Sequence, residues 1–295
     1  MSVSVKTIKC IVILYLLVLT DLAKASDQSC EATDCIDTNS WQLGIAVGLG
    51  ARSNPLSGGD DIPLVILPDI AWYGESWYFD NGELGYQWNP SPTTSIEWFL
   101  TPNTEKANFS FWHTANVLIP AASLGSDIPD NAAPPEDNVF EPYELDVDDI
   151  GSRRWALDGG FRFQWHINSH HVRLTTKTDV SNVHNGYQLD FDYRYQLLVD
   201  DWRFSVAPSV SWLSSNLTNY YYGVSEQDTD NSRLIYVGRS GFQVGLGLSA
   251  NYTINEQWHV LLRADFTKLH RGMTDSPIVS DTSIKSAFAG LAYRF

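Results

Sequence analysis

The chain has 295 residues, 43% of them hydrophobic and 18% charged, and its 35 acidic residues outnumber 19 Lys and Arg to give a formal net charge of −16. A chain this acidic is a poor general partner for nucleic acid, because its charge repels the phosphate backbone. No stretch beyond the first 25 residues holds 18 apolar residues in a row, so a membrane protein with this sequence has to be a closed barrel.

Residues 1–25 are typical of a secretory signal peptide. Lys6 and Lys9 stand near the start, residues 10–19 are apolar, and Ala23-Lys24-Ala25 offers small residues at a cleavage site. The apolar run is too short to span a bilayer, which argues against a retained anchor helix. Export of a barrel-forming chain predicts the outer membrane of a Gram-negative bacterium.

Residues 26–40 are acidic and polar and are predicted to form a periplasmic tail. This tail holds Cys30 and Cys35, the cysteines that remain after the signal is removed. An oxidising periplasm favours a disulfide between them. Two free thiols and half of a metal clip are the alternatives, and two cysteines alone complete no zinc site.

Five strand candidates precede the first long loop. Alternating apolar and polar residues, with regularly spaced glycines in the first candidate, predict strands at 41–50, 64–73, 77–88 and 93–101, and a weaker one at 108–114. In the third candidate, Asn81-Gly82 is either a bulge or a turn.

Residues 116–154 show no strand pattern. Five prolines interrupt the segment, and nine acidic residues between Asp127 and Asp149 meet no basic residue before Arg153. Such a composition predicts a long solvated loop.

After this loop the alternation becomes dense. Strands are predicted at 155–166, 172–180, 187–199, 202–212, 234–252, 257–269 and 283–295. The clearest pair is the hairpin of residues 187–212. One face of its first strand is apolar and the other polar, with Tyr187, Leu189, Phe191, Tyr193, Tyr195, Leu197 and Val199 opposite Gln188, Asp190, Asp192, Arg194 and Gln196.

The length of this hairpin points to a membrane. Soluble strands usually run about five or six residues, whereas a transmembrane barrel strand needs about 9 to 11 residues and aromatic girdles at both interfaces. Both strands exceed ten residues, and Trp202 and Trp212 stand at the two ends of the second. The pattern favours a membrane barrel over the alternative, a soluble β-sandwich.

The predicted fold class is therefore all-β: a transmembrane antiparallel up-and-down β-barrel of twelve strands in residues 41–295, with ten strands as the alternative. The short connections are expected on the periplasmic side, near Gly74, Asn103, Ser169, Asp200 and Asn255. The long connections, including the acidic loop at 116–154, are then extracellular.

The chain ends on an aromatic face formed by Leu291, Tyr293 and the terminal Phe295. Together with Gly290, Tyr293 and Phe295 resemble the insertion signal that the barrel assembly machinery reads at the end of outer-membrane proteins. An ordinary edge strand is the alternative interpretation.

Three segments resemble the MipA/OmpV family of outer-membrane proteins. They are the run 219–225 with Tyr221, Tyr222, Gly223, Val224 and Ser225, the run 275–279 with Ser276 and Pro277, and the closing residues 290–295. The resemblance implies a scaffold that links a murein hydrolase to a murein synthase, or a stress-responsive porin-like protein or adhesin.

The inward face of the predicted barrel carries interleaved charges, among them Asp190, Asp192, Arg194, Arg203, Arg239 and Arg263. They form either a closed plug of ion pairs or the lining of a selective channel. No nucleophile motif accompanies the scattered His and Asp residues, so no catalytic residue, metal or cofactor is predicted. For the tyrosines at 220–222, an aromatic girdle is favoured over a partner-binding surface.

The expected protein is a non-enzymatic outer-membrane barrel with a scaffold role, and a channel or adhesin is the alternative. Its expected partners are outer-membrane lipid, the barrel assembly machinery and a murein hydrolase and synthase; the oligomeric state stays open. A periplasmic partner would have the tail at 26–40 and the turn at 102–107 to bind, because every other predicted periplasmic connection is short.

Overall fold

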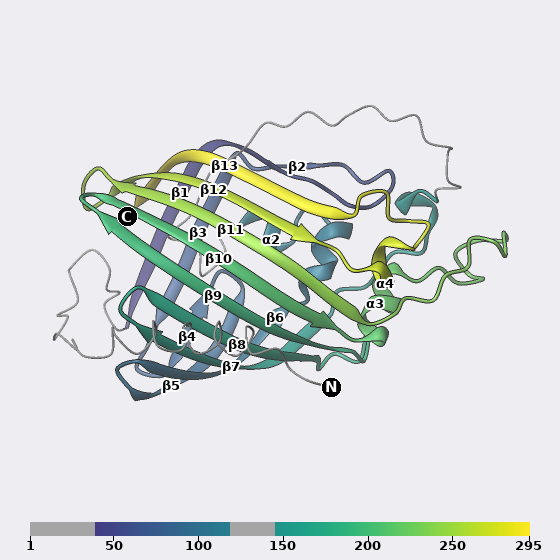
Figure 1. Cartoon of the computed structure of the whole chain (residues 1–295), viewed down its shortest axis with the longest axis horizontal. Helices are drawn as coiled ribbons and strands as arrows, with labels where there is room; N and C mark the ends of the chain where they lie inside the picture. The colour runs from purple at the N-terminus through teal and green to yellow at the C-terminus, as the bar shows by residue number, and fades with distance from the viewer. Residues whose placement is uncertain (1–38, 119–144) are drawn as a thin grey trace, which may run out of the picture. The chain divides into compact units, whose positions relative to one another are not determined.

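The computed structural model describes residues 39–118 and 145–295. The described part is a closed antiparallel barrel, because β13 (Ser283–Arg294) pairs with both β12 (Trp258–Lys268) and β1 (Ser40–Arg52) (Figure 1). The predicted signal peptide, the disulfide between Cys30 and Cys35, and most of the acidic loop lie outside the described residues. None of the helices in the described ranges is long and apolar enough to cross a membrane.

Each remaining strand pairs with its neighbours in chain order. The bounds are β2 (Ile62–Pro63), β3 (Ile66–Tyr73), β4 (Trp77–Asp80), β5 (Glu83–Ser91), β6 (Thr94–Pro102), β7 (Leu157–Ile167), β8 (His170–Asp179), β9 (Tyr187–Val199), β10 (Trp202–Leu213) and β11 (Gly241–Thr253). β2 and β3 both pair with β1 and together form one interrupted wall strand, so the barrel has twelve strands, as predicted.

The strand count is right, but two of the predicted strands are wrong. Residues 77–88 are two strands, because Asn81 and Gly82 both have positive φ (46° and 97°) and make a tight hairpin turn. Residues 108–114 are not a strand: the 3₁₀ helix η1 (Thr104–Phe109) and the short helix α2 (Thr114–Val117) occupy this region. The additional strand within residues 77–88 and the strand that is missing at 108–114 leave the total at twelve.

The hairpin of β4 and β5 is short and leaves part of the wall open. β4 pairs only with residues 71–73 of β3, although β1 continues to pair along residues 62–70. Ile70 exchanges hydrogen bonds with Asn81, so Pro68, two residues earlier, presents the same edge. Proline suits an unpaired edge, because it has no N–H to satisfy. α2 lies beside this gap, where a Cβ on Gly82 would be 2.9 Å from Thr114.

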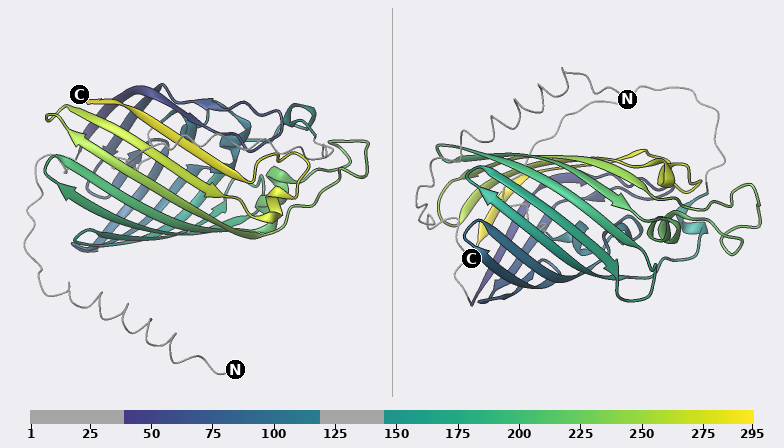
Figure 2. Two further views of the ribbon diagram at one scale, coloured as in Figure 1. Left: turned by 45° about the horizontal axis from the view of Figure 1, so that its top comes forward. Right: turned by 60° about the horizontal axis from the view of Figure 1, so that its bottom comes forward.

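Apart from the tight turn at Asn81-Gly82, the connections are sorted by length between the two ends. Tight turns at 74–76, 92–93, 168–169, 200–201 and 254–257 share one end with the C-terminus, and the long connections and the helices α3 (Ser215–Tyr222) and α4 (Arg271–Thr274) lie at the other (Figures 1 and 2). The prediction of a periplasmic turn at 102–107 was wrong: the extra hairpin moves this segment to the helix end and makes Pro92-Thr93 the turn. The predicted strand at 234–252 also begins later, at Gly241.

The outer face of the barrel is apolar. In β9, Tyr187, Leu189 and Phe191 are exposed, whereas Gln188 between them is buried toward the lumen. Aromatic rings cluster at the turn end: Trp202 lies 4.9 Å from Tyr252 and Trp258 lies 4.9 Å from Tyr293, measured between ring centroids. An apolar exterior with an interfacial aromatic girdle is the surface of a transmembrane barrel.

Glycines allow the barrel to close tightly. At the seam between β1 and β13, Gly48 pairs with Gly290. A Cβ on Gly48 would lie 2.2 Å from the carbonyl oxygen of Ala289, and one on Gly290 would lie 2.5 Å from that of Val47. Gly290 thus has a packing role at the seam, while Tyr293 and Phe295 form an edge-to-face pair at the turn end.

Candidate functional site in the capped lumen

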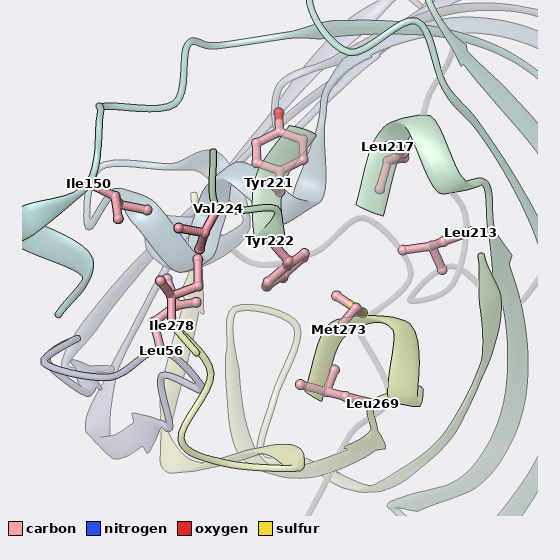
Figure 3. Close-up of a cluster of buried hydrophobic side chains, with 10 residues drawn as sticks. All are labelled: Leu56, Ile150, Leu213, Leu217, Tyr221, Tyr222, Val224, Leu269, Met273 and Ile278. Carbon is pink, nitrogen blue, oxygen red and sulfur yellow. The ribbon is translucent and has the colours of Figure 1, made fainter. Parts of the chain in front are cut away.

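A packed apolar cluster lies at the helix end of the barrel. Figure 3 shows Tyr222 between two groups of its side chains, with Leu56, Ile150, Val224 and Ile278 on one side and Leu213, Leu217, Leu269 and Met273 on the other. These residues come from β10, α3, α4, the connections on either side of α4, and the connections β1–β2, β6–β7 and α3–β11. Tyr221 and Tyr222 are both 0% exposed. The interpretation of these tyrosines as a membrane girdle was therefore wrong; they form the core of a cap.

The residues that carry the family resemblance hold this cap together. Ser276 donates its hydroxyl to the carbonyl oxygen of Tyr222 at 2.6 Å. The N–H of Gly223 donates to the carbonyl oxygen of Asn219 at the end of α3. A Cβ on Gly223 would lie 2.3 Å from this oxygen. Val224 forms an isolated β-bridge with Tyr236.

Two further motif residues fix the edges of the cap. Pro277 accepts a hydrogen bond from the N–H of Leu145, which ties the end of the acidic loop to the motif. Ser225 donates its hydroxyl to Asp228 at 2.8 Å. Because the contacts of Ser276 and Pro277 join different connections and the others fix the α3–β11 connection, the motif is a structural element of the cap.

A chain of polar contacts leads from the cap into the lumen. The Tyr222 hydroxyl donates to Glu105 Oε2 at 2.6 Å and accepts from Asn108 Nδ2 at 2.7 Å. Asn108 Oδ1 in turn accepts from Arg52 Nη2 at 2.7 Å. Burial raises the pKa of the Glu105 carboxyl and raises the pKa of the Tyr222 phenol well above its usual value. This series of contacts could not be predicted from the sequence, because its residues are far apart in the chain and only Tyr222 belongs to a motif.

The lumen on the β4–β7 side is filled by an ion-pair network. Arg162 contacts Glu83 at 2.7 Å and Glu97 at 2.8 Å, and its guanidinium lies 4.2 Å from the ring centroid of Phe99. The Tyr78 hydroxyl donates to Glu83 at 2.7 Å. Both carboxylates are thus paired with the guanidinium inside the barrel, as buried charges must be, although Arg162 Nε has no hydrogen-bond partner.

The luminal residues singled out in the sequence do not form one group. Asp190 pairs with Lys177 at 3.5 Å, and Arg263 pairs with Asp265 at 2.6 Å. Arg194 forms no ion pair with any described residue, so it takes no part in the ion pairs of the lumen. Asp192 and Arg203 lie on inward-facing positions of β9 and β10, half-buried.

Arg239 is not luminal, contrary to the prediction. It precedes β11 in the connection at the helix end, its side chain is 65% exposed, and it pairs with Asp275 at 2.5 Å. The predicted strand at 234–252 wrongly included residues 234–240, which belong to the connection between α3 and β11.

Asp158, Asp179 and His184 bring three potential metal ligands within 4.8 Å of one another. Their atoms are already occupied. Asp179 Oδ2 accepts the N–H groups of residues 183–185, and Asp158 accepts from His184 Nε2 at 3.1 Å and from Asn103 Nδ2 at 2.7 Å. His184 Nδ1 accepts the N–H of Gly186 at 3.0 Å. These hydrogen bonds therefore hold the turn at 180–186 against Asn103, at the end of β6.

The family model described as MltA-interacting protein MipA matches residues 43–295. YiaT of Escherichia coli O157:H7 is 22% identical over 255 residues, which cover 86% of this chain and 91% of that protein. The MltA-interacting protein of Escherichia coli K12 is 27% identical over 147 residues, covering 50% of this chain and 59% of that protein. Omp26La of Vibrio anguillarum is 26% identical over 151 residues, covering 50% and 58%. The chain thus spans little more than half the length of the last two relatives.

Among solved structures, the NanC porin has a TM-score of 0.41 at 8% identity, covering 86% of this chain and 100% of that one. The CymD monoaromatic hydrocarbon channel has a TM-score of 0.40 at 10% identity, covering 88% of each chain. Several relatives are named as outer membrane proteins of Gram-negative bacteria, and with the barrel fold they locate this protein in the outer membrane.

Proposed function

This chain belongs to the MltA-interacting protein MipA family, and from this premise we propose that it is a non-enzymatic outer-membrane scaffold that brings a murein hydrolase and a murein synthase together. The MltA-interacting protein of Escherichia coli K12 supports the choice of partner through its name. The barrel anchors the scaffold in the membrane, and the end that carries the short turns faces the periplasm.

The closed cap is the observation that carries this proposal. A general diffusion porin needs a continuous water path, whereas here a buried apolar cluster lies across the helix end. The ion pairs of Arg162 with Glu83 and Glu97 fill part of the lumen below it. A capped and partly filled barrel suits a structural role better than free passage of solutes.

The binding surface follows from the topology. The five turns at the periplasmic end are short, and the segment 102–107 lies at the opposite end. The acidic tail at 26–40 is then the segment long enough to hold a partner, with the exposed Trp41 at its junction with β1. An acidic tail suits a partner with a basic surface.

Deletion of residues 27–38 tests this proposal. The shortened protein should still assemble, as judged by heat-modifiable mobility in gels, but should no longer retain a murein hydrolase in a pull-down from solubilised envelopes. An equal-length deletion at 124–135 in the acidic loop is the matched control and should retain the hydrolase. Unchanged retention by the tail deletion would remove the tail as the main contact.

A selective channel is the second candidate, and two cavities in the lumen favour it. Both lie below the cap and share Arg52, Thr267 and Ile284 in their linings. Planar-bilayer recordings separate the two candidates. The scaffold predicts a barrel that stays closed, and steady conductance with ion selectivity would favour the channel.

A further inference from the structure

Arg52 is a luminal cation with an unsatisfied donor. It is the last residue of β1, its Nη2 donates to Asn108, and its Nη1 is buried without a hydrogen-bond partner. No carboxylate of the described residues lies within ion-pair distance of it. Burying a charge without a counter-ion is costly. A guanidinium kept in this state is therefore suited to an anion that arrives from outside the chain.

Arg52 lines two adjoining cavities, of about 280 Å³ and about 210 Å³. The larger has an extensive apolar wall, which consists of Leu64, Leu67, Leu118, Leu261, Ile284 and Phe288. The smaller is mainly polar. An occupant of the larger cavity can thus bury an apolar body while its charged end stays beside Arg52.

The acidic groups near Arg52 are already engaged. Asp265 is held by two hydrogen bonds from Arg263, at 2.6 Å and 3.1 Å, and by a third from Ser286 at 3.0 Å. Glu105 accepts from the Tyr222 hydroxyl, and burial raises the pKa of its carboxyl. Both carboxyl groups therefore have partners other than Arg52.

A second residue that lines the larger cavity also has an unsatisfied buried atom. Asn116 is 2% exposed, and its Nδ2 donates to two carbonyl oxygens, of Ala107 at 2.8 Å and Ser110 at 2.9 Å. This pair of acceptors fixes the orientation of the amide and leaves Oδ1 as a buried acceptor without a partner. Two residues that line the cavity thus each keep a buried polar atom without a partner, a donor on Arg52 and an acceptor on Asn116, and a ligand reaches these atoms when the side chains turn toward the cavity.

We propose that the larger cavity is a binding site for a small amphipathic monocarboxylate that also carries a hydroxyl or amide donor. The carboxylate pairs with the Arg52 guanidinium, the apolar body packs on Leu67, Leu261 and Phe288, and the donor meets the Asn116 amide. The cavity lies at the lower end of the roughly 300–1,000 Å³ of small-molecule pockets, which limits the ligand to about ten heavy atoms.

The site is tested by equilibrium dialysis of the purified full-length barrel in non-ionic detergent. The probe is 4-hydroxybenzoate, which has the carboxylate, the apolar ring and the hydroxyl donor. Benzoate lacks the donor, and 4-hydroxybenzyl alcohol lacks the charge. We expect affinity to fall in this order, because loss of the charged hydrogen bond costs more than loss of a neutral one.

Arg52→Gln should weaken 4-hydroxybenzoate binding by about 30-fold or more, the ratio expected when one partner of a buried charge pair is removed. Arg52→Lys keeps the charge and should recover part of the affinity. Arg194→Gln is the matched control, since it removes a luminal guanidinium that lines neither cavity, and it should bind as wild type.

Three results would overturn the proposal: no saturable binding to the wild type at millimolar probe, equal affinity for the neutral alcohol, or equal losses in Arg52→Gln and Arg194→Gln. If Arg52→Gln fails to assemble, the comparison of the three probes on the wild type still decides. No murein partner enters the measurement, so its outcome is independent of the scaffold proposal.

Discussion

The hydroxyl of Ser276 donates to the carbonyl oxygen of Tyr222 at 2.6 Å and so joins two connections whose residues lie 54 positions apart. Ser276 is 3% exposed and Tyr222 is fully buried. This contact lies at the centre of the cap that closes the barrel, and the stability of the cap should depend on it.

Replacing Ser276 with alanine leaves the buried carbonyl of Tyr222 without this donor, which costs about 1–3 kcal/mol. Hydrogen exchange should become faster in residues 214–225 and 271–280 while exchange in the strands stays unchanged. The control is Ser280→Ala in the same connection, because the Ser280 hydroxyl lies 3.5 Å from its acceptor, the carbonyl of Pro55. Equal effects of the two variants would contradict a special role of Ser276.

Arg162→Gln should lower the unfolding midpoint in a urea titration of the detergent-solubilised barrel. It leaves Glu83 and Glu97 without their cation. Breaking a buried pair costs about 3 to 5 kcal/mol, and less where water enters. Arg194→Gln is the control and should unfold near the wild-type midpoint, because Arg194 has no carboxylate partner in the described chain. Similar midpoints for both variants would show that the network around Arg162 adds little stability.

Acidification should loosen the cap. Burial lowers the pKa of His113 to about 4 and of His270 to about 4, from 6.5 in the unfolded chain. Between these values the unfolded chain binds a proton that the folded chain excludes, so stability falls as pH drops from about 6.5 to about 4. Each histidine contributes at most about 3 kcal/mol at 1.36 kcal/mol per pKa unit.

Proteolysis of the cap between pH 7 and pH 5 provides the measurement for this prediction. The rise in cleavage at the lower pH should be smaller when both His113 and His270 are replaced by glutamine. Glu105 acts in the opposite direction, since burial raises its pKa and its protonation stabilises the fold as pH falls. A wild-type cap that becomes more resistant in acid would mean that Glu105 outweighs the histidines.

The topology predicts which end of the barrel faces the outside. A protease recognition sequence inserted after Asp230, in the exposed connection between α3 and β11, should be cut in intact cells. The same sequence inserted after Asp201, in the turn between β9 and β10, should be cut only after the outer membrane is permeabilised. The reverse pattern would invert the assignment of the two ends.

The sequence alone determined the wall of the barrel. In β9 and β10, every second residue faces lipid and the residues between them face the lumen, so the alternation from Tyr187 to Trp212 is a local property that can be read without knowing the fold. The same holds for the short turns at 74–76, 168–169, 200–201 and 254–257 and for the aromatic C-terminal strand. The same pattern wrongly predicted a strand at 108–114, because the helical segment in the barrel mouth has the apolar content of a short strand.

Only the tertiary structure decided what fills the lumen. Arg52 and Asn108 lie 56 positions apart, and Asn108 and Glu105 lie 114 and 117 positions from Tyr222. These contacts exist because the barrel brings the ends of β1, β6 and β10 to the same rim and the connections fold inward over it. Periodicity describes what a residue faces, lipid or lumen, but not which residue it meets there. Only the closed barrel shows that Arg52 lines the luminal cavities and that Arg239 lies outside them.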